Sequence, residues 1–106
     1  MSGSDGPGGG GGLTGTESCE DLRLARLLEA GEPAVVATLA VGDVMIVQLN
    51  PGPPEVVAVL TAGGDLAGGI SPTVQLVNCL RRRFPFEATV VSKAGGAVHL
   101  EVRAAS

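Results

Sequence analysis

The chain has 106 residues, 44% of them hydrophobic and 2% aromatic, with a formal net charge of −4. This length predicts a single domain with one modest core, built from Val, Leu, Ile and Ala because aromatic residues are nearly absent. The negative charge excludes a protein that is drawn as a whole to phosphates, and without an apolar run of about 18 residues no membrane span is expected.

The N-terminal segment is rich in glycine. Its first 16 residues are mostly Gly, Ser and Thr around one leucine, and such a segment cannot bury enough apolar surface to offset the entropy lost on ordering. We predict a disordered tail over residues 1–16 and one small domain over residues 17–106. No basic region followed by an apolar segment marks a secretory signal, so the expected location is cytoplasmic, with no membrane partner.

The next segment, residues 19–30, carries mixed signals. Its composition favours a helix, whereas Leu22 and Leu24 alternate with Arg23 as they would in a strand. A meander of strands follows, and a closed barrel needs a first strand, so we predict a strand over residues 21–28. Pro33 then begins a short helical turn that extends to Leu39, because proline suits the first helical position.

Glycine and proline turns separate five aliphatic runs, which predict the remaining strands: residues 44–49, 56–60, 65–70, 86–91 and 97–102. The first two runs are apolar on both faces, which predicts central positions in a sheet with a helix covering one side. Gly68 and Gly69 interrupt the third run, where glycine typically marks a bulge or a close approach of two backbones.

One amphipathic helix is predicted over residues 73–83, with Ser71 as its N-cap and Pro72 at its first position. Apolar residues recur along it at helical spacing and form its buried stripe, and Pro85 prevents it from continuing. Together these elements predict a mainly β (α+β) fold. It is a small partly open β-barrel of five to six strands, with one short helical turn and one longer helix packed across it.

Several short motifs follow one another in a recognisable order. A Gly42-Asp43 turn precedes strand 44–49, Asn50-Pro51 opens a proline-rich turn, and a glycine-containing strand leads into Ser71-Pro72. This order resembles the HIRAN domain family over roughly residues 34–92. That family is a small β-barrel similar to an OB-fold, found attached to helicases and nucleases or alone, and associated with binding DNA ends. The resemblance implies an OB-like barrel that contacts DNA.

Charge is distributed unevenly along the chain. Residues 1–72 contain nine acids and two bases, whereas residues 73–106 contain five bases and two acids. The residues predicted to contact a nucleic acid or an acidic partner are Arg81, Arg82, Arg83 and Lys93. An alternative role for the three arginines is to cap the helix, because cations at a helix C-terminus interact favourably with its dipole.

Catalytic and metal-binding chemistry finds weak support in the sequence. Cys79, His99 and Glu101 supply the residue types of a nucleophilic set, but Cys79 lies beside the apolar helical stripe while the other two share an outward strand face. Cys19 and Cys79 have no metal-ligand spacing. We predict that both are small buried hydrophobic side chains rather than a disulfide, as expected in a reducing location. We predict no enzymatic activity, no cofactor and no metal.

Three functions remain compatible with these features. The first is a non-catalytic binding module that contacts nucleic acid, at DNA ends or along the backbone, as a HIRAN-like domain. The second is a protein-interaction or self-assembly module, because so hydrophobic a chain with a polar tail leaves apolar surface exposed. The third, a small hydrolase that uses Cys79 and His99, has the least support, and no small-molecule substrate is expected.

Overall fold

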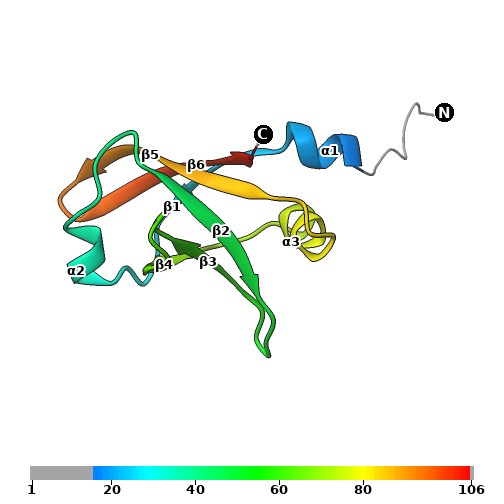
Figure 1. Cartoon of the computed structure of the whole chain (residues 1–106), viewed down its shortest axis with the longest axis horizontal. Coiled ribbons are helices and arrows are strands. Elements are labelled where there is room, and N and C mark those ends of the chain that lie inside the picture. The colour runs from blue at the N-terminus through cyan, green and yellow to red at the C-terminus, as the bar shows by residue number, and fades with distance from the viewer. Residues whose placement is uncertain (1–15, 106) are drawn as a thin grey trace.

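The computed structural model describes residues 16–105. They form an antiparallel sheet of six strands in the spatial order β1-β6-β5-β2-β3-β4, and this sheet curls into a half-barrel (Figure 1). The strands are β1 Arg23–Leu27, β2 Val44–Asn50, β3 Val56–Leu60, β4 Leu66–Ile70, β5 Phe86–Ala94 and β6 Ala97–Ala104. The helices are α1 Thr16–Asp21, α2 Pro33–Val36 and α3 Val74–Arg81. The predicted mainly β, partly open barrel with one helical turn and one longer helix is confirmed.

Two backbone hydrogen bonds join the segment that follows β1 to β4, the strand at the opposite end of the order, and so hold the sheet in its curl. Glu29 follows β1, and its N–H and carbonyl exchange hydrogen bonds with Gly69 of β4 at 2.8 and 2.9 Å. The Glu32 N–H adds a third bond to the Ala67 carbonyl at 2.9 Å. The segment that leads from β1 to α2 therefore covers the edge of β4.

The prediction that glycine in the β4 run marks a bulge or a close backbone approach is confirmed. The register with β3 shifts between Val59 and Leu60. A Cβ added at Gly68 would lie 2.6 Å from the Glu29 carbonyl oxygen and 3.0 Å from Leu28 Cδ1. Only a residue without a side chain lets the segment after β1 approach β4 this closely.

The core lies inside the curl of the sheet and is aliphatic, as the composition predicts. Alternate residues of the central strands point inward, so that Met45 and Val47 of β2 are buried while their neighbours are exposed. Phe86 is buried, and Phe84 packs against it with ring centroids 5.7 Å apart. Both aromatic rings thus serve packing. Among residues 19–105 no polar or charged side chain is buried.

The segment with mixed signals contains two elements. α1 ends at Asp21 and β1 begins at Arg23, so helical and alternating patterns meet within a few residues. The predicted first strand is confirmed with shorter bounds, and it pairs with β6 through Leu24 opposite Val102. The helix that precedes it was not predicted as a separate element.

The start of α3 corrects one prediction. Thr73, not Ser71, is the N-cap, because its Oγ1 accepts a hydrogen bond from the Leu76 N–H at 3.1 Å. The Ser71 hydroxyl instead donates to Glu29 Oε2 at 2.6 Å. Both residue types are suited to capping, but the Ser71 hydroxyl is hydrogen-bonded to a carboxylate that is distant in the sequence.

The two cysteines also correct a prediction. Both are buried, as expected, but they are not free thiols: Cys19 of α1 and Cys79 of α3 form a disulfide with a Cα–Cα distance of 5.8 Å. The sequence separation of 60 residues gives no sign that the two helices pack side by side, within the distance that a disulfide requires. The bond ties the helix before β1 to the only helix longer than two turns in residues 16–105.

The helices are short, with six residues in α1, four in α2 and eight in α3. Within residues 16–105 none is long and apolar enough to cross a membrane. The predicted tail over residues 1–16 lies outside the described residues except for Thr16, where α1 begins.

Candidate functional site

The three predicted contact arginines lie at the C-terminal end of α3, where the helix closes with a Schellman motif. The Arg83 N–H bonds to the Leu80 carbonyl at 3.0 Å, and the Phe84 N–H bonds to the Cys79 carbonyl at 3.1 Å. Arg83 has a φ of 67°, the left-handed conformation that often ends a helix and that glycine usually occupies. The closure holds the three arginines in one turn before Pro85.

Arg81 is committed to an ion pair. Its Nη2 lies 2.6 Å from Glu55 Oε1, and its Nε donates to Glu55 Oε2 at 3.2 Å. Because 53% of the arginine side chain and 37% of the glutamate side chain are exposed, the pair adds little to stability. It does occupy the guanidinium fork that would otherwise hold a phosphate or a partner's carboxylate.

Lys93 is not brought together with the arginines. Its Nζ donates to the carbonyl oxygens of Val36 and Leu39, each at 2.8 Å, and so caps the last turn of α2. It stands near the end of β5, whereas the arginines precede the start of that strand (Figure 1). At about 3.4 Å per residue, a strand of this length separates the two positions by roughly 25 Å.

Arg82 and Arg83 are the cations that remain for a partner at this end of the molecule. Both are exposed, and neither side chain forms a hydrogen bond or an ion pair with another side chain or backbone atom of residues 19–105. Arg83 lines a hollow of about 580 Å³ between the β2–β3 hairpin and the end of α3, together with Gln48 and Pro51. A contact between these arginines and nucleic acid stays a prediction.

The side chains considered for catalysis do not form a site. The Cys79 sulfur is bonded to Cys19 and buried, so it is not a thiolate nucleophile in this state. His99 is exposed on the outward side of β6, as the alternation predicts. No group of three or more metal-ligating side chains that could hold an ion occurs within residues 16–105.

The outward side of β2, β3 and β4 carries exposed aliphatic side chains together with smaller and polar ones. We call it the outer face, and its residues are Val44, Ile46, Gln48, Asn50, Val56, Ala58, Leu60, Leu66 and Gly69. They share one side of the sheet because residues paired across antiparallel strands point the same way, and the register sets Ile46 opposite Leu60 and Leu60 opposite Leu66. The four large aliphatic side chains at positions 44, 46, 56 and 66 are 48–56% exposed.

The predicted helix cover of the two apolar strands is present on the inward side alone, where α3 packs against β2 and adds Leu76 and Cys79 to the core. Their central positions are confirmed, since β2 lies between β5 and β3, and β3 lies between β2 and β4. Their outward side has no such cover, as the exposure of Ile46 and Val56 shows. The sequence does show that residues 44–49 and 56–60 are apolar at every position except Gln48. Periodicity, however, cannot tell a covered face from a bare one.

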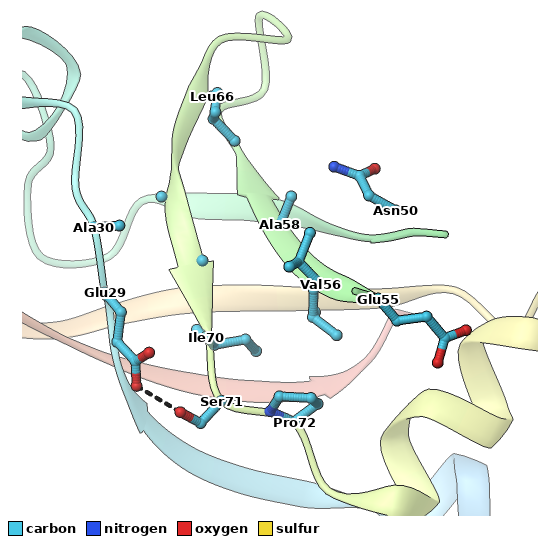
Figure 2. Close-up of a pocket in the computed structure, with 13 residues that line it drawn as sticks. Glu29, Ala30, Asn50, Glu55, Val56, Ala58, Leu66, Ile70, Ser71 and Pro72 are labelled. Carbon is cyan, nitrogen blue, oxygen red and sulfur yellow. Dashed lines mark hydrogen bonds between the residues drawn. The ribbon is translucent and has the colours of Figure 1, made fainter. Parts of the chain in front are cut away.

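A pocket of about 410 Å³ lies in the outer face beside β3 and β4 (Figure 2). Its floor includes the cross-strand pair of Ala58 and Gly69, where side chains are small or missing. Val56 and Leu66 stand higher around this floor. The pocket is therefore made by small residues set among larger aliphatic ones.

Two carboxylates border the pocket. In Figure 2, Glu29 stands on one side with its hydrogen bond from Ser71, and Glu55 stands on the other. Glu55 is the partner of Arg81, whereas Glu29 makes no ion pair within residues 16–105. The arrangement can hold an apolar group with a positive charge beside it.

Comparison with known proteins identified no relative: no protein-family model, no curated protein and no solved structure matches the chain. The HIRAN resemblance therefore stays a prediction, and the function has to be inferred from the geometry of the outer face and of the arginines at the end of α3.

Proposed function

We propose that this domain is a non-catalytic module that binds a protein partner on its outer face. The observation that carries the proposal is that four aliphatic side chains on the outward side of adjoining strands are half exposed: Val44 and Ile46 on β2, Val56 on β3 and Leu66 on β4. Single exposed apolar residues are ordinary on protein surfaces, but several on one side of a sheet, two of them (Val56 and Leu66) lining a pocket, are typical of an interaction site.

Burying these side chains against a partner would contribute a useful free energy of binding. Fully burying a Val, Leu or Ile side chain contributes about 1.5–3 kcal/mol. Because these four side chains are already about half buried, each retains about 1 kcal/mol that a partner would gain. A weak or transient complex is expected from such a patch alone, and a tighter one requires anchors in the pocket.

The test is a selection of random peptides, displayed on phage, on the full-length chain. The variant Ile46→Thr/Val56→Thr keeps β-branched residues suited to strands while removing half of the exposed aliphatic groups. We expect the selected peptides to bind this variant at least about tenfold more weakly than the wild type. The matched control is Val74→Thr, which changes a residue of α3 that is 78% exposed and lies outside the outer face.

Unchanged binding to Ile46→Thr/Val56→Thr would refute the proposal, as would equal losses in Val74→Thr. The proposal also fails if no peptide is enriched on the wild type over the double variant. Thermal unfolding of all three proteins identifies any loss that arises from unfolding rather than from the surface.

A nucleic-acid contact, which the HIRAN resemblance implies, is the second candidate function. It is supported by the exposed guanidinium groups of Arg82 and Arg83 beside the hollow at the end of α3. It is weakened because Arg81 and Lys93, half of the predicted contact set, are engaged within the fold. The chain also carries a net charge of −4, which opposes approach to DNA.

If this second candidate is correct, fluorescence anisotropy with single- and double-stranded oligonucleotides should detect binding at low salt. Two phosphate contacts predict that the logarithm of the affinity falls with the logarithm of the salt concentration with a slope of about −2. Arg82→Ala/Arg83→Ala should abolish that binding, whereas Lys93→Ala should leave it intact. Binding that survives the double substitution, or an absence of binding at low salt, would exclude the arginines as a nucleic-acid site.

The disulfide also bears on the location of the protein. Disulfides persist in oxidising compartments and are rare where glutathione and thioredoxin keep thiols reduced. The Cys19–Cys79 bond therefore weighs against the predicted cytoplasmic location. We propose that the protein works where this bond is maintained.

A further inference from the structure

The floor of the pocket in the outer face is formed by residues with small side chains or none. Ala58 of β3 is paired directly with Gly69 of β4, and Ala58 is only 5% exposed. A larger side chain at position 58 would project into the pocket, because this position points outward like Gln48 opposite it on β2. The pocket is thus open to a side chain from a partner.

The size and chemistry of the pocket suit an aliphatic group. Its volume of about 410 Å³ falls within the range of about 300–1,000 Å³ that is usual for ligand sites. Val56 and Leu66 line it from β3 and β4, and Pro72 closes one end. An aliphatic side chain placed there would be surrounded by carbon on several sides, which is the setting of an interface hot spot.

Two carboxylates, Glu29 and Glu55, line the pocket, and two bases lie beside it. Arg81 pairs with Glu55, whereas Arg26 donates its Nε–H to the Ser71 carbonyl at 2.7 Å and forms no ion pair with Glu29. Glu29 therefore has no cation paired with it in residues 19–105, and Glu55 shares its charge with Arg81 alone. A basic residue in the partner would therefore gain from being next to the pocket.

The same charge argues against a second copy of this chain as the occupant. A two-fold dimer places the same patch on both sides of the interface, so that the unpaired Glu29 of each copy would lie in it. Every copy also carries a net charge of −4. Like charges brought together in this way disfavour the complex, whereas a cationic segment of another protein is attracted.

We infer that the pocket is the anchor site for a segment of another protein that inserts an aliphatic side chain between β3 and β4 and sets a Lys or Arg beside Glu29. This inference rests on the proposed function and names its partner. In an extended segment, alternate residues point to the same side, so the aliphatic and the basic residue are expected at neighbouring positions. Specificity then comes from the pocket and the charge, while the aliphatic residues around it contribute area.

The test uses the peptides selected on the full-length chain, with two further variants. Ala58→Leu fills the pocket without making the outer face less apolar, and Glu29→Gln removes the charge while keeping an oxygen that can accept the Ser71 hydrogen bond. We expect enriched peptides that share Leu, Ile or Val next to Lys or Arg. Their affinity should fall at least about tenfold in Ala58→Leu and about fivefold in Glu29→Gln at low salt, with the second loss shrinking as salt is added.

The possible outcomes separate this inference from the proposed function. Peptides that need Ile46 and Val56 but bind Ala58→Leu and Glu29→Gln like the wild type would overturn the pocket while leaving the outer face as the binding surface. Acidic peptides, or peptides without a charge preference, would overturn the charged part of the inference. A dimer of the wild-type chain in sedimentation equilibrium that Ala58→Leu abolishes would assign the pocket to a second copy and overturn the inference.

Discussion

Replacing both cysteines, as Cys19→Ala/Cys79→Ala, is expected to lower the free energy of unfolding by about 4 kcal/mol. The reason lies mainly in the unfolded chain, which the bond closes into a loop spanning the 60-residue separation of the two cysteines, with an entropic penalty of that size. Alanine is chosen because both positions are buried and a hydroxyl would be left without a partner there. In a domain of this size the melting temperature should fall by roughly 15–30 °C.

Urea unfolding of the double variant, with the single variant Cys19→Ala as control, measures this effect. The single variant should lose about as much stability, because it also lacks the bond. Reduction of the wild type should give the same shift, and no free thiol should be titrated before reduction. A double variant within about 1 kcal/mol of the wild type, or two free thiols in the unreduced wild type, would contradict the disulfide.

Gly68→Ala is the second substitution with a large expected effect, a loss of about 2–4 kcal/mol. The added methyl group would lie 2.6 Å from the Glu29 carbonyl oxygen, so β4 and the segment after β1 must move apart. That movement stretches the two hydrogen bonds between Glu29 and Gly69, and overpacking adds its own cost. Gly68 does not have a positive φ, so the loss would report the contact and not the backbone conformation.

Gly63→Ala is the matched control. Gly63 lies in the turn between β3 and β4, its nearest neighbour for an added Cβ is Thr61 Oγ1 at 3.9 Å, and its φ is not positive. The stability of the Gly63→Ala variant should equal that of the wild type or slightly exceed it, because alanine restricts the unfolded chain. If the two substitutions change the free energy of unfolding equally in urea, the close contact between Glu29 and β4 does not stabilise the curl of the sheet.

Much of the fold could be predicted because its signals are local. Alternating aliphatic residues locate five strands to within a few residues, and Pro85 predicts where α3 must end. The features that were missed depend on contacts between distant segments. Thr73 caps α3, while the hydroxyl of Ser71 donates to Glu29, 42 residues away. The disulfide likewise requires that α1 and α3 meet, which no spacing in the sequence reveals.

The candidate site shows the same division. The position of three arginines at a helix end follows from the sequence, but the pairing of Arg81 with Glu55 joins residues 26 apart. The engagement of Lys93 with the Val36 carbonyl joins residues 57 apart. The sequence shows aliphatic residues on both sides of two strands, but not which side α3 covers and which side stays exposed. Local patterns predict which residues are apolar, and only the packing of distant elements decides which of them remain exposed.

A map of amide chemical-shift changes in NMR, recorded while a selected peptide is added to the full-length chain, tests the central claim most directly. If the outer face is the binding surface, the largest changes should fall on β2, β3 and β4, around Ile46, Ala58 and Gly69. Changes centred instead on Arg82 and Arg83 at the end of α3, with β3 and β4 unaffected, would contradict it.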